Sequence, residues 1–151
     1  MAEALAHFMR DDVAPAVAEL GAPLASVIGY DSFECRGRNR VISAKLSEHG
    51  KANAIDVRGF RLGNGSVVEL TSPIVPKDFR ERVRTAACSR FTTVLGPGSD
   101  GYHESHVHFD LAERKGGYRM CQWDVREPPV LADVPLPLPR PVAQADDGKP
   151  K

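Results

Sequence analysis

The stretch AIDVRGFRLGNGSVVEL, residues 54–70, carries the clearest local signal in the chain. Its first nine residues are mostly apolar and include β-branched side chains, so we expect a strand over residues 54–62. Asn64-Gly65 favours the tight turn of a β-hairpin, because both residues tolerate a positive φ. Residues 66–70 then supply the returning strand. The stretch predicts an antiparallel hairpin with one acidic side chain, Asp56, between two apolar neighbours.

The rest of the sequence predicts two helices and several further strands around this hairpin. Apolar residues recur at helical spacing over residues 5–20, and Gly21 is a natural end for that helix. Pro15 should kink or restart it, because proline lacks a backbone donor. A second helix is expected over residues 77–90. Further strands are expected at residues 25–30, 91–95, 107–111 and 118–123, with Gly116-Gly117 turning the chain between the last two.

These elements predict an α+β domain over residues 1–126, with a small mixed or antiparallel sheet and two main helices. Seven of the 25 residues from 127 to 151 are proline, which predicts a disordered or polyproline tail.

The overall composition narrows the classes of partner. The chain has 20 basic and 20 acidic residues, so its net charge gives no reason to expect nucleic acid or an anionic membrane. No apolar run approaches the roughly 20 residues that cross a bilayer. The first residues lack the basic and apolar regions of a signal peptide. The protein is therefore either cytoplasmic, or its printed start lies downstream of a removed leader.

Four of the five histidines lie in two short polar clusters, at residues 47–56 and 103–108. Strand alternation would place His106 and His108 on one face, with Asp110 beyond them, and the intervening apolar residues in the core. Asp56 alternates with apolar neighbours in the same way, and His49 precedes it in a loop. Two imidazoles and a carboxylate can bind zinc and leave a fourth position for water, which is typical of a catalytic site.

The polar residues of these two clusters are also compatible with simpler roles. A His-x-His pair on a strand is often a solvated polar face. Asp56 could cap a turn or pair with Arg58 or Arg61, and His103 lies in a polar loop where solvation is expected. Non-haem iron oxygenases also use two histidines and a carboxylate, but their usual pattern is His-x-Asp/Glu on one strand. The six residues between His49 and Asp56 argue against that class.

The three cysteines, Cys35, Cys88 and Cys121, match no Cys-x-x-Cys metal pattern, and an odd number cannot all pair internally. They are either three reduced, buried residues, or one disulfide and a cysteine whose partner is absent from the chain.

Several motifs between Tyr30 and Trp123, about two thirds of the chain, resemble the extensin-like C-terminal domain of bacterial proteins. The matching segments are CRGRN (35–39), LSEHGKANAID (46–56), ACSRFTTVLGP (87–97) and HESHVHFD (103–110), with Cys121 beyond them. That family is in turn similar to zinc peptidases of the D-alanyl-D-alanine carboxypeptidase and murein endopeptidase type. These share Ser-x-His, six residues, Asp and a late His-x-His. The hedgehog signalling domain has the same fold and binds zinc without being known as a peptidase.

The resemblance implies a hedgehog/DD-peptidase-like fold and zinc-dependent hydrolysis of a cell-wall (peptidoglycan) peptide, with a metal-activated water attacking an amide bond. The implied zinc ligands are His49, Asp56 and His108, and His106 is the implied general base or stabiliser of the water. Further implied site residues are His103 and Ser47, which would orient substrate, and Arg36 or Arg38, which would neutralise a substrate carboxylate or the developing oxyanion. Some relatives carry a glutamate where this chain has Ser105, and Glu104 is one residue out of place.

The resemblance also implies an extracytoplasmic setting, in the periplasm or cell envelope, and a disulfide between Cys88 and Cys121 that leaves Cys35 for an absent partner. Because Ser105 replaces the expected acid, a non-catalytic zinc module that recognises a wall polymer or a protein partner is the main alternative. A cytoplasmic domain with an incidental polar face and no metal is a third.

Overall fold

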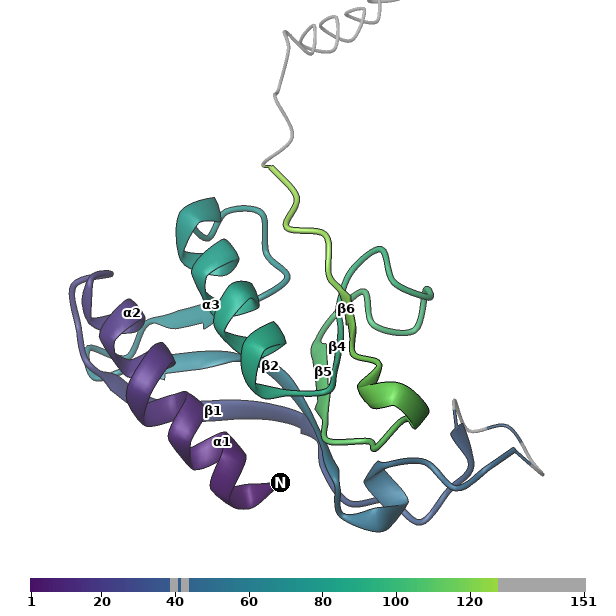
Figure 1. The fold of residues 1–151 in the computed structure, drawn as a ribbon. Helices are drawn as coiled ribbons and strands as arrows, with labels where there is room; N and C mark the ends of the chain where they lie inside the picture. The colour runs from purple at the N-terminus through teal and green to yellow at the C-terminus, as the bar shows by residue number, and fades with distance from the viewer. Residues whose placement is uncertain (39–40, 42–43, 128–151) are drawn as a thin grey trace, which may run out of the picture.

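The computed structural model describes residues 1–38, 41 and 44–127, so the predicted tail lies outside the described residues except for Glu127. The helices are α1 (Ala2–Phe8), α2 (Ala14–Ala18) and α3 (Lys77–Arg90), with a π-helical segment, Met9–Val13, joining the first two. The strands are β1 (Leu24–Asp31), β2 (Ala54–Leu62), β3 (Val67–Glu69), β4 (Thr93–Leu95), β5 (Val107–Asp110) and β6 (Met120–Gln122). The α+β prediction, with a mixed six-stranded sheet and two main helical elements, is confirmed (Figure 1).

The strand β2 organises the sheet, whose order is β1-β2-β5-β4-β6, with β3 also beside β2. It pairs antiparallel with β1, β3 and β5. The predicted hairpin forms, since the Leu62 amide donates to the Ser66 carbonyl at 2.9 Å across the turn. The strand and the helix expected at residues 54–62 and 77–90 have the predicted bounds, whereas β3, β4 and β6 are shorter than predicted.

The expected return of the chain at Gly116-Gly117 takes a different route from a simple hairpin. Both glycines adopt positive φ in the short 3₁₀ turn Lys115–Gly117. The following strand, β6, pairs with β4 in parallel, rather than with β5. The reason is that β5 already has β2 on one edge and β4 on the other, so the chain must pass to the next open edge.

The helices cover one face of the sheet, as Figure 1 shows. Phe8 of α1 packs edge-on against Phe91 and Phe109, with ring centroids 5.4 and 5.6 Å away, and all three rings are buried. Pro15 lies in the first turn of α2, where its missing donor is tolerated, and the π-helical segment directly before it takes up the irregularity. The helix ends before Gly21, whose φ is +99°, as the sequence predicts.

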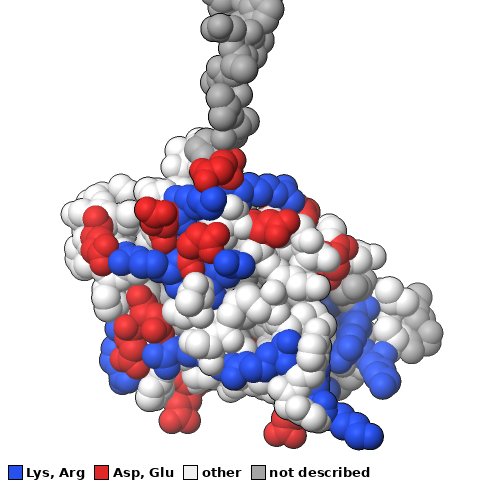
Figure 2. Space-filling view, turned by 45° about the horizontal axis from the view of Figure 1, so that its top comes forward, with Lys and Arg blue, Asp and Glu red and all other residues white. Residues whose placement is uncertain are grey.

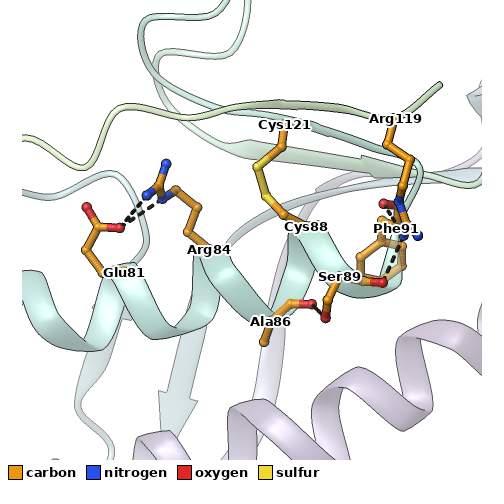
Figure 3. Close-up of a disulfide and its surroundings, with 8 residues drawn as sticks. All are labelled: Glu81, Arg84, Ala86, Cys88, Ser89, Phe91, Arg119 and Cys121. Carbon is orange, nitrogen blue, oxygen red and sulfur yellow. Dashed lines mark hydrogen bonds and ion pairs between the residues drawn. A yellow bond between two sulfur atoms is a disulfide. The ribbon is translucent and has the colours of Figure 1, made fainter.

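A disulfide joins Cys88 of α3 to Cys121 of β6, with Cα atoms 5.7 Å apart (Figure 3). This pairing is the predicted one, and Cys35 is an exposed free cysteine. The bond fastens the edge strand β6 to the end of α3, and closing a loop of this length is worth about 3–4 kcal/mol. Next to it, Arg119 donates to the carbonyls of Ser89 and Phe91, both at 2.9 Å.

The surface carries charges of both signs. In the view of Figure 2, acidic and basic side chains are interspersed, as the balanced composition leads one to expect. Among the described residues, no helix has the length and hydropathy needed to cross a membrane.

Candidate metal centre

The pairing of β2 with β5 brings the two polar clusters together. Asp56 lies directly opposite His108 in the antiparallel register, while Val57 and Val107 of the same strands are fully buried in the core. Because strand side chains alternate, the acid and the imidazole share the sheet face away from the helices. His49 comes from a short 3₁₀ turn, His49–Lys51, just before β2. All three side chains are buried, and so is His106, so the interpretation of the His-x-His pair as a solvated polar face is wrong.

The turn that carries His49 is held by the side chain of Glu48. Its carboxylate accepts hydrogen bonds from Lys51 Nζ at 2.7 Å and Asn53 Nδ2 at 2.8 Å. The Ser47 hydroxyl accepts from the His49 amide at 3.3 Å, so Ser47 lies at the site as part of its backbone support. The segment LSEHGKANAID therefore forms a local scaffold that presents one imidazole to the sheet.

Two imidazole nitrogen atoms and one carboxylate oxygen atom lie close together. His49 Nε2 lies 3.1 Å from His108 Nδ1 and 3.3 Å from Asp56 Oδ1, and the last two atoms are 2.8 Å apart. Tetrahedral zinc with bonds of about 2.0–2.1 Å places its ligand atoms about 3.3–3.4 Å apart. Among the described residues, these three form the group that could hold a metal ion.

The outer nitrogens of both imidazoles have acceptors of their own. His49 Nδ1 lies 2.6 Å from the Ser32 carbonyl, and His108 Nε2 lies 3.1 Å from Asp110 Oδ2. Protons on those nitrogens leave lone pairs on the two that face Asp56. Three acceptor atoms then point at each other in a buried place, which is stable only with a cation between them. The donor set fits a metal ion, and the outer partners are those that orient metal-bound histidines.

The closeness of these groups shifts their pKa values in the metal-free protein. Burial lowers the pKa of His108, but hydrogen bonds with Asp110 and Asp56 outweigh it and raise the pKa to about 9. Burial raises the pKa of Asp56, yet hydrogen bonds from His106, His108 and His49 hold it far below its usual value. A proton thus takes the cation's place when no metal is bound, and metal binding must release it.

Two further histidines lie beside the three candidate ligands. His106 Nε2 is 3.4 Å from Asp56 Oδ2, and its ring stacks on Tyr30 with centroids 4.3 Å apart and planes 7° from parallel. His103 is 8% exposed, so its expected solvation is wrong. Its Nδ1 lies 2.7 Å from Asp100 Oδ1. Burial lowers the pKa of His103 more than Asp100 raises it.

The arginines considered as site residues differ in their surroundings. Arg36 forms ion pairs with Asp31 and Glu34, and Arg38 is exposed, although both line the same cavity of about 500 Å³ as the histidines. Neither of the arginines proposed as partners of Asp56 pairs with it, and Arg58 contacts Glu69 instead.

Glu104 points away from the site, as its sequence position suggests. Its carboxylate accepts from the Gly98 amide at 2.8 Å and lies 3.0 Å from Arg126 Nη2.

Sequence reasoning placed Asp110 on the site face but gave it no role, and it missed several other residues that line the cavity, among them Tyr30, Thr93, Asp100 and Arg114. The spacing of Asp100 three residues before His103 is a signal that could have been used. Tyr30, Thr93 and Arg114 reach the cavity only through tertiary pairing, for which the local sequence gives no sign.

A family model described as the extensin-like protein C-terminus matches residues 1–122. The chain belongs to this family. The match includes α1 and α2 as well as the motifs between Tyr30 and Trp123, so the first helices are part of the extensin-like domain. No curated protein and no solved structure matched the chain.

Replacing Asp110 with asparagine should weaken metal binding by the extensin-like domain about 10–100-fold, because the neutral amide supports the His108 imidazole less strongly. Zinc titration with a competing chelator measures this. Asp100→Asn is the matched control, since it makes the same change beside His103, and its affinity should equal that of the wild type. Equal losses in the two variants would contradict the assignment of His108 as a ligand.

Stripped of metal, the domain should lose stability as the pH rises from 6.5 through about 9. A folded-state pKa of about 9 for His108, against 6.5 for the free side chain, stabilises the fold fully below pH 6.5 and no longer above pH 9. This difference corresponds to about 3 kcal/mol of unfolding free energy. The lowered pKa values of Asp56 and His103 act at lower pH and do not oppose the trend.

Urea unfolding of a Cys35→Ser variant, between pH 6 and about 9.5, measures this loss without thiol exchange. Saturating zinc should flatten the profile, since the ion replaces the proton. A metal-free stability that rises over this range would refute the prediction.

Proposed function

We propose that this extensin-like domain is a zinc-dependent hydrolase of cell-wall (peptidoglycan) peptides. The observation that carries the proposal is the convergence of His49, Asp56 and His108 within a cavity that also holds two histidines outside the ligand set. A structural zinc site has four protein ligands, whereas three leave a position for water. The motif resemblance to zinc peptidases, and the hedgehog/DD-peptidase-like fold that it implies, belong to the same proposal.

Zinc is the ion we propose because the donors are two imidazoles and one carboxylate at nearly tetrahedral spacing. When bound, zinc supplies Lewis acidity that lowers the pKa of a coordinated water toward about 7. The protein's own contribution is to exclude bulk solvent from the three buried side chains. It also fixes the tautomers of two imidazoles, that of His49 through the Ser32 carbonyl and that of His108 through Asp110.

His106 is the group we assign to proton transfer. It is buried beside the carboxylate of Asp56, lines the cavity, and is not one of the three converging ligands. It would accept a proton from the attacking water and return it to the leaving amine. The stacked Tyr30 ring limits the orientations of the imidazole, whose own hydrogen-bond contacts are long at 3.4 Å. His103, held by Asp100, lies against His106 and would orient substrate.

The setting that fits this activity is extracytoplasmic. A disulfide between Cys88 and Cys121 supports it, because such bonds persist in oxidising compartments.

A non-catalytic zinc module is the second candidate, and one observation favours it. Ser105 occupies the position of a glutamate in some of the similar peptidases, and Glu104 is turned toward Gly98 and Arg126. Such a module would bind the metal and the wall polymer without cutting it.

The two candidates differ in what replacing His106 with glutamine does. If His106 transfers protons, the variant should release peptide fragments from peptidoglycan at least about 100-fold more slowly than the wild type. Its zinc content should remain at the wild-type level, because His106 is not a ligand. Chromatography of released fragments and elemental analysis measure the two quantities. Metal-loaded wild type that binds peptidoglycan but releases nothing between pH 5 and 9 would identify the domain as a binding module.

A further inference from the structure

The three tyrosines of the chain are all exposed, whereas most of its other aromatic rings are buried. Tyr30, Tyr102 and Tyr118 are 59%, 62% and 60% exposed. Five of the six phenylalanines and the single tryptophan lie in the core. Tyr30 and Tyr102 line the cavity of the candidate metal centre, and Tyr118 does not. Two exposed rings that each carry a hydroxyl therefore lie where this cavity opens to solvent.

An irregularity in β1 directs the Tyr30 side chain to the site. Gly29 pairs with Val57 of β2, and Asp31 pairs with the residue directly before Val57, so Tyr30 is the extra residue of a β-bulge. Bulges next to active sites commonly re-aim a side chain. The Tyr30 ring lies flat on His106, with centroids 4.3 Å apart and planes 7° from parallel. This stacking fixes the plane of the ring, although more than half of the residue stays in solvent.

Tyr102 is presented by a turn that the side chain of Asp100 holds. Asp100 Oδ1 accepts a hydrogen bond from the Tyr102 amide at 3.0 Å and lies 2.7 Å from His103 Nδ1. The His103 ring in turn lies against His106, with centroids 5.2 Å apart. Each of the two exposed tyrosines is therefore adjacent to one of the two histidines outside the candidate ligand set.

The other groups that line the cavity are mostly polar. The hydrogen bonds found on the Asp100 carboxylate in the described part of the chain all go to Oδ1, which leaves Oδ2 as an acceptor for a ligand. Arg38 is an exposed donor in the same cavity. Among the described lining residues, only Leu95 and Met120 are aliphatic. The cavity thus offers flat rings and hydrogen-bonding groups rather than an enclosed apolar pocket.

A sugar ring has the chemistry that complements these groups. One face of a pyranose carries C–H groups, which pack on the negative face of an aromatic ring, while its edge carries hydroxyls that need polar partners. An aliphatic side chain would use the rings but not the polar groups, and a phosphate would use the cations but not the rings. A cavity of about 500 Å³ has room for a sugar with a short peptide attached.

We propose that Tyr30 and Tyr102 form a saccharide subsite beside the metal centre, so that the preferred ligand is a peptide still joined to its sugar. This specificity rests on the proposed hydrolysis and names its substrate as a glycopeptide rather than a free peptide. Because stacking on His106 already orders the Tyr30 ring, a sugar that binds there loses little of its affinity to ordering the side chain.

The test compares N-acetylmuramyl-L-alanyl-D-isoglutamine with acetyl-L-alanyl-D-isoglutamine, which lacks the sugar. Binding to the zinc-loaded full chain is measured by calorimetry in the cold, and chromatography reports whether each ligand stays intact. The sugar-linked peptide should bind at least about tenfold more tightly, as expected from a stacked ring and a hydrogen bond to a carboxylate. Tyr30→Leu and Tyr102→Leu should each reduce this ratio at least about threefold, whereas Tyr30→Phe and Tyr102→Phe should keep most of it, because the ring remains.

Tyr118→Leu is the matched control. Tyr118 is as exposed as Tyr102 but lies outside the cavity lining. This variant should keep the wild-type ratio, and thermal unfolding of all three leucine variants reports any structural loss. Tyr102→Leu also controls for an indirect effect through His106, since the stacking partner of His106 is Tyr30.

The outcomes distinguish the subsite from the reaction. A wild-type ratio near one, or a ratio that survives in both Tyr30→Leu and Tyr102→Leu, would overturn the subsite. An equal fall in Tyr118→Leu would overturn it as well. Cleavage of free wall peptides, with equal binding of the two ligands, would leave the hydrolysis standing without the subsite. A preference for the sugar that depends on both tyrosines, without cleavage of any wall peptide, would support the subsite and contradict the hydrolysis.

Discussion

Three lone-pair donors buried at one point are the constraint on which the rest of this structure depends. His49, Asp56 and His108 are each less than 8% exposed, and their inner atoms lie about 3 Å apart. Burying such groups without a cation is costly. In the metal-free protein a proton on His108 offsets that cost. A metal ion would offset it better, because one ion could contact all three atoms at once.

The register of β2 and β5 places two of these donors next to each other. Asp56 and His108 face each other across β2 and β5, so a slip of one residue would turn one of them into the aliphatic and aromatic core. The core therefore protects the site: Val57, Val107 and Phe109 are buried on the opposite face and lock the register. The same sheet positions Thr93 and Asp110, which makes the outer partner of His108 as well defined as the ligand.

Local pattern predicted much of this fold. The hairpin at residues 54–70 and the helix at 77–90 follow from alternation, turn chemistry and helical periodicity, which act within one segment. The place of β6 did not, because it depends on which sheet edges remain open after β5 has paired. That the predicted ligands lie together could be expected from the motif resemblance and from the alternation of side chains along the strands. Tyr30 is distant in sequence from His106, on which it stacks, and β1 lies beside β2 only in the folded sheet. Arg114 follows His108 by six residues, but its position at the cavity depends on its hydrogen bonds to Thr92 and Thr93.

The central claim is that these three side chains hold one metal ion, and metal stoichiometry tests it most directly. After exposure to zinc and removal of excess ion, elemental analysis should find about one zinc per chain in the wild type and in His7→Ala, which alters an exposed histidine of α1. His49→Ala, Asp56→Ala and His108→Ala should each lose most of it while remaining folded by circular dichroism. Ligand variants that keep the wild-type content, or a wild type that retains no zinc, would contradict the account.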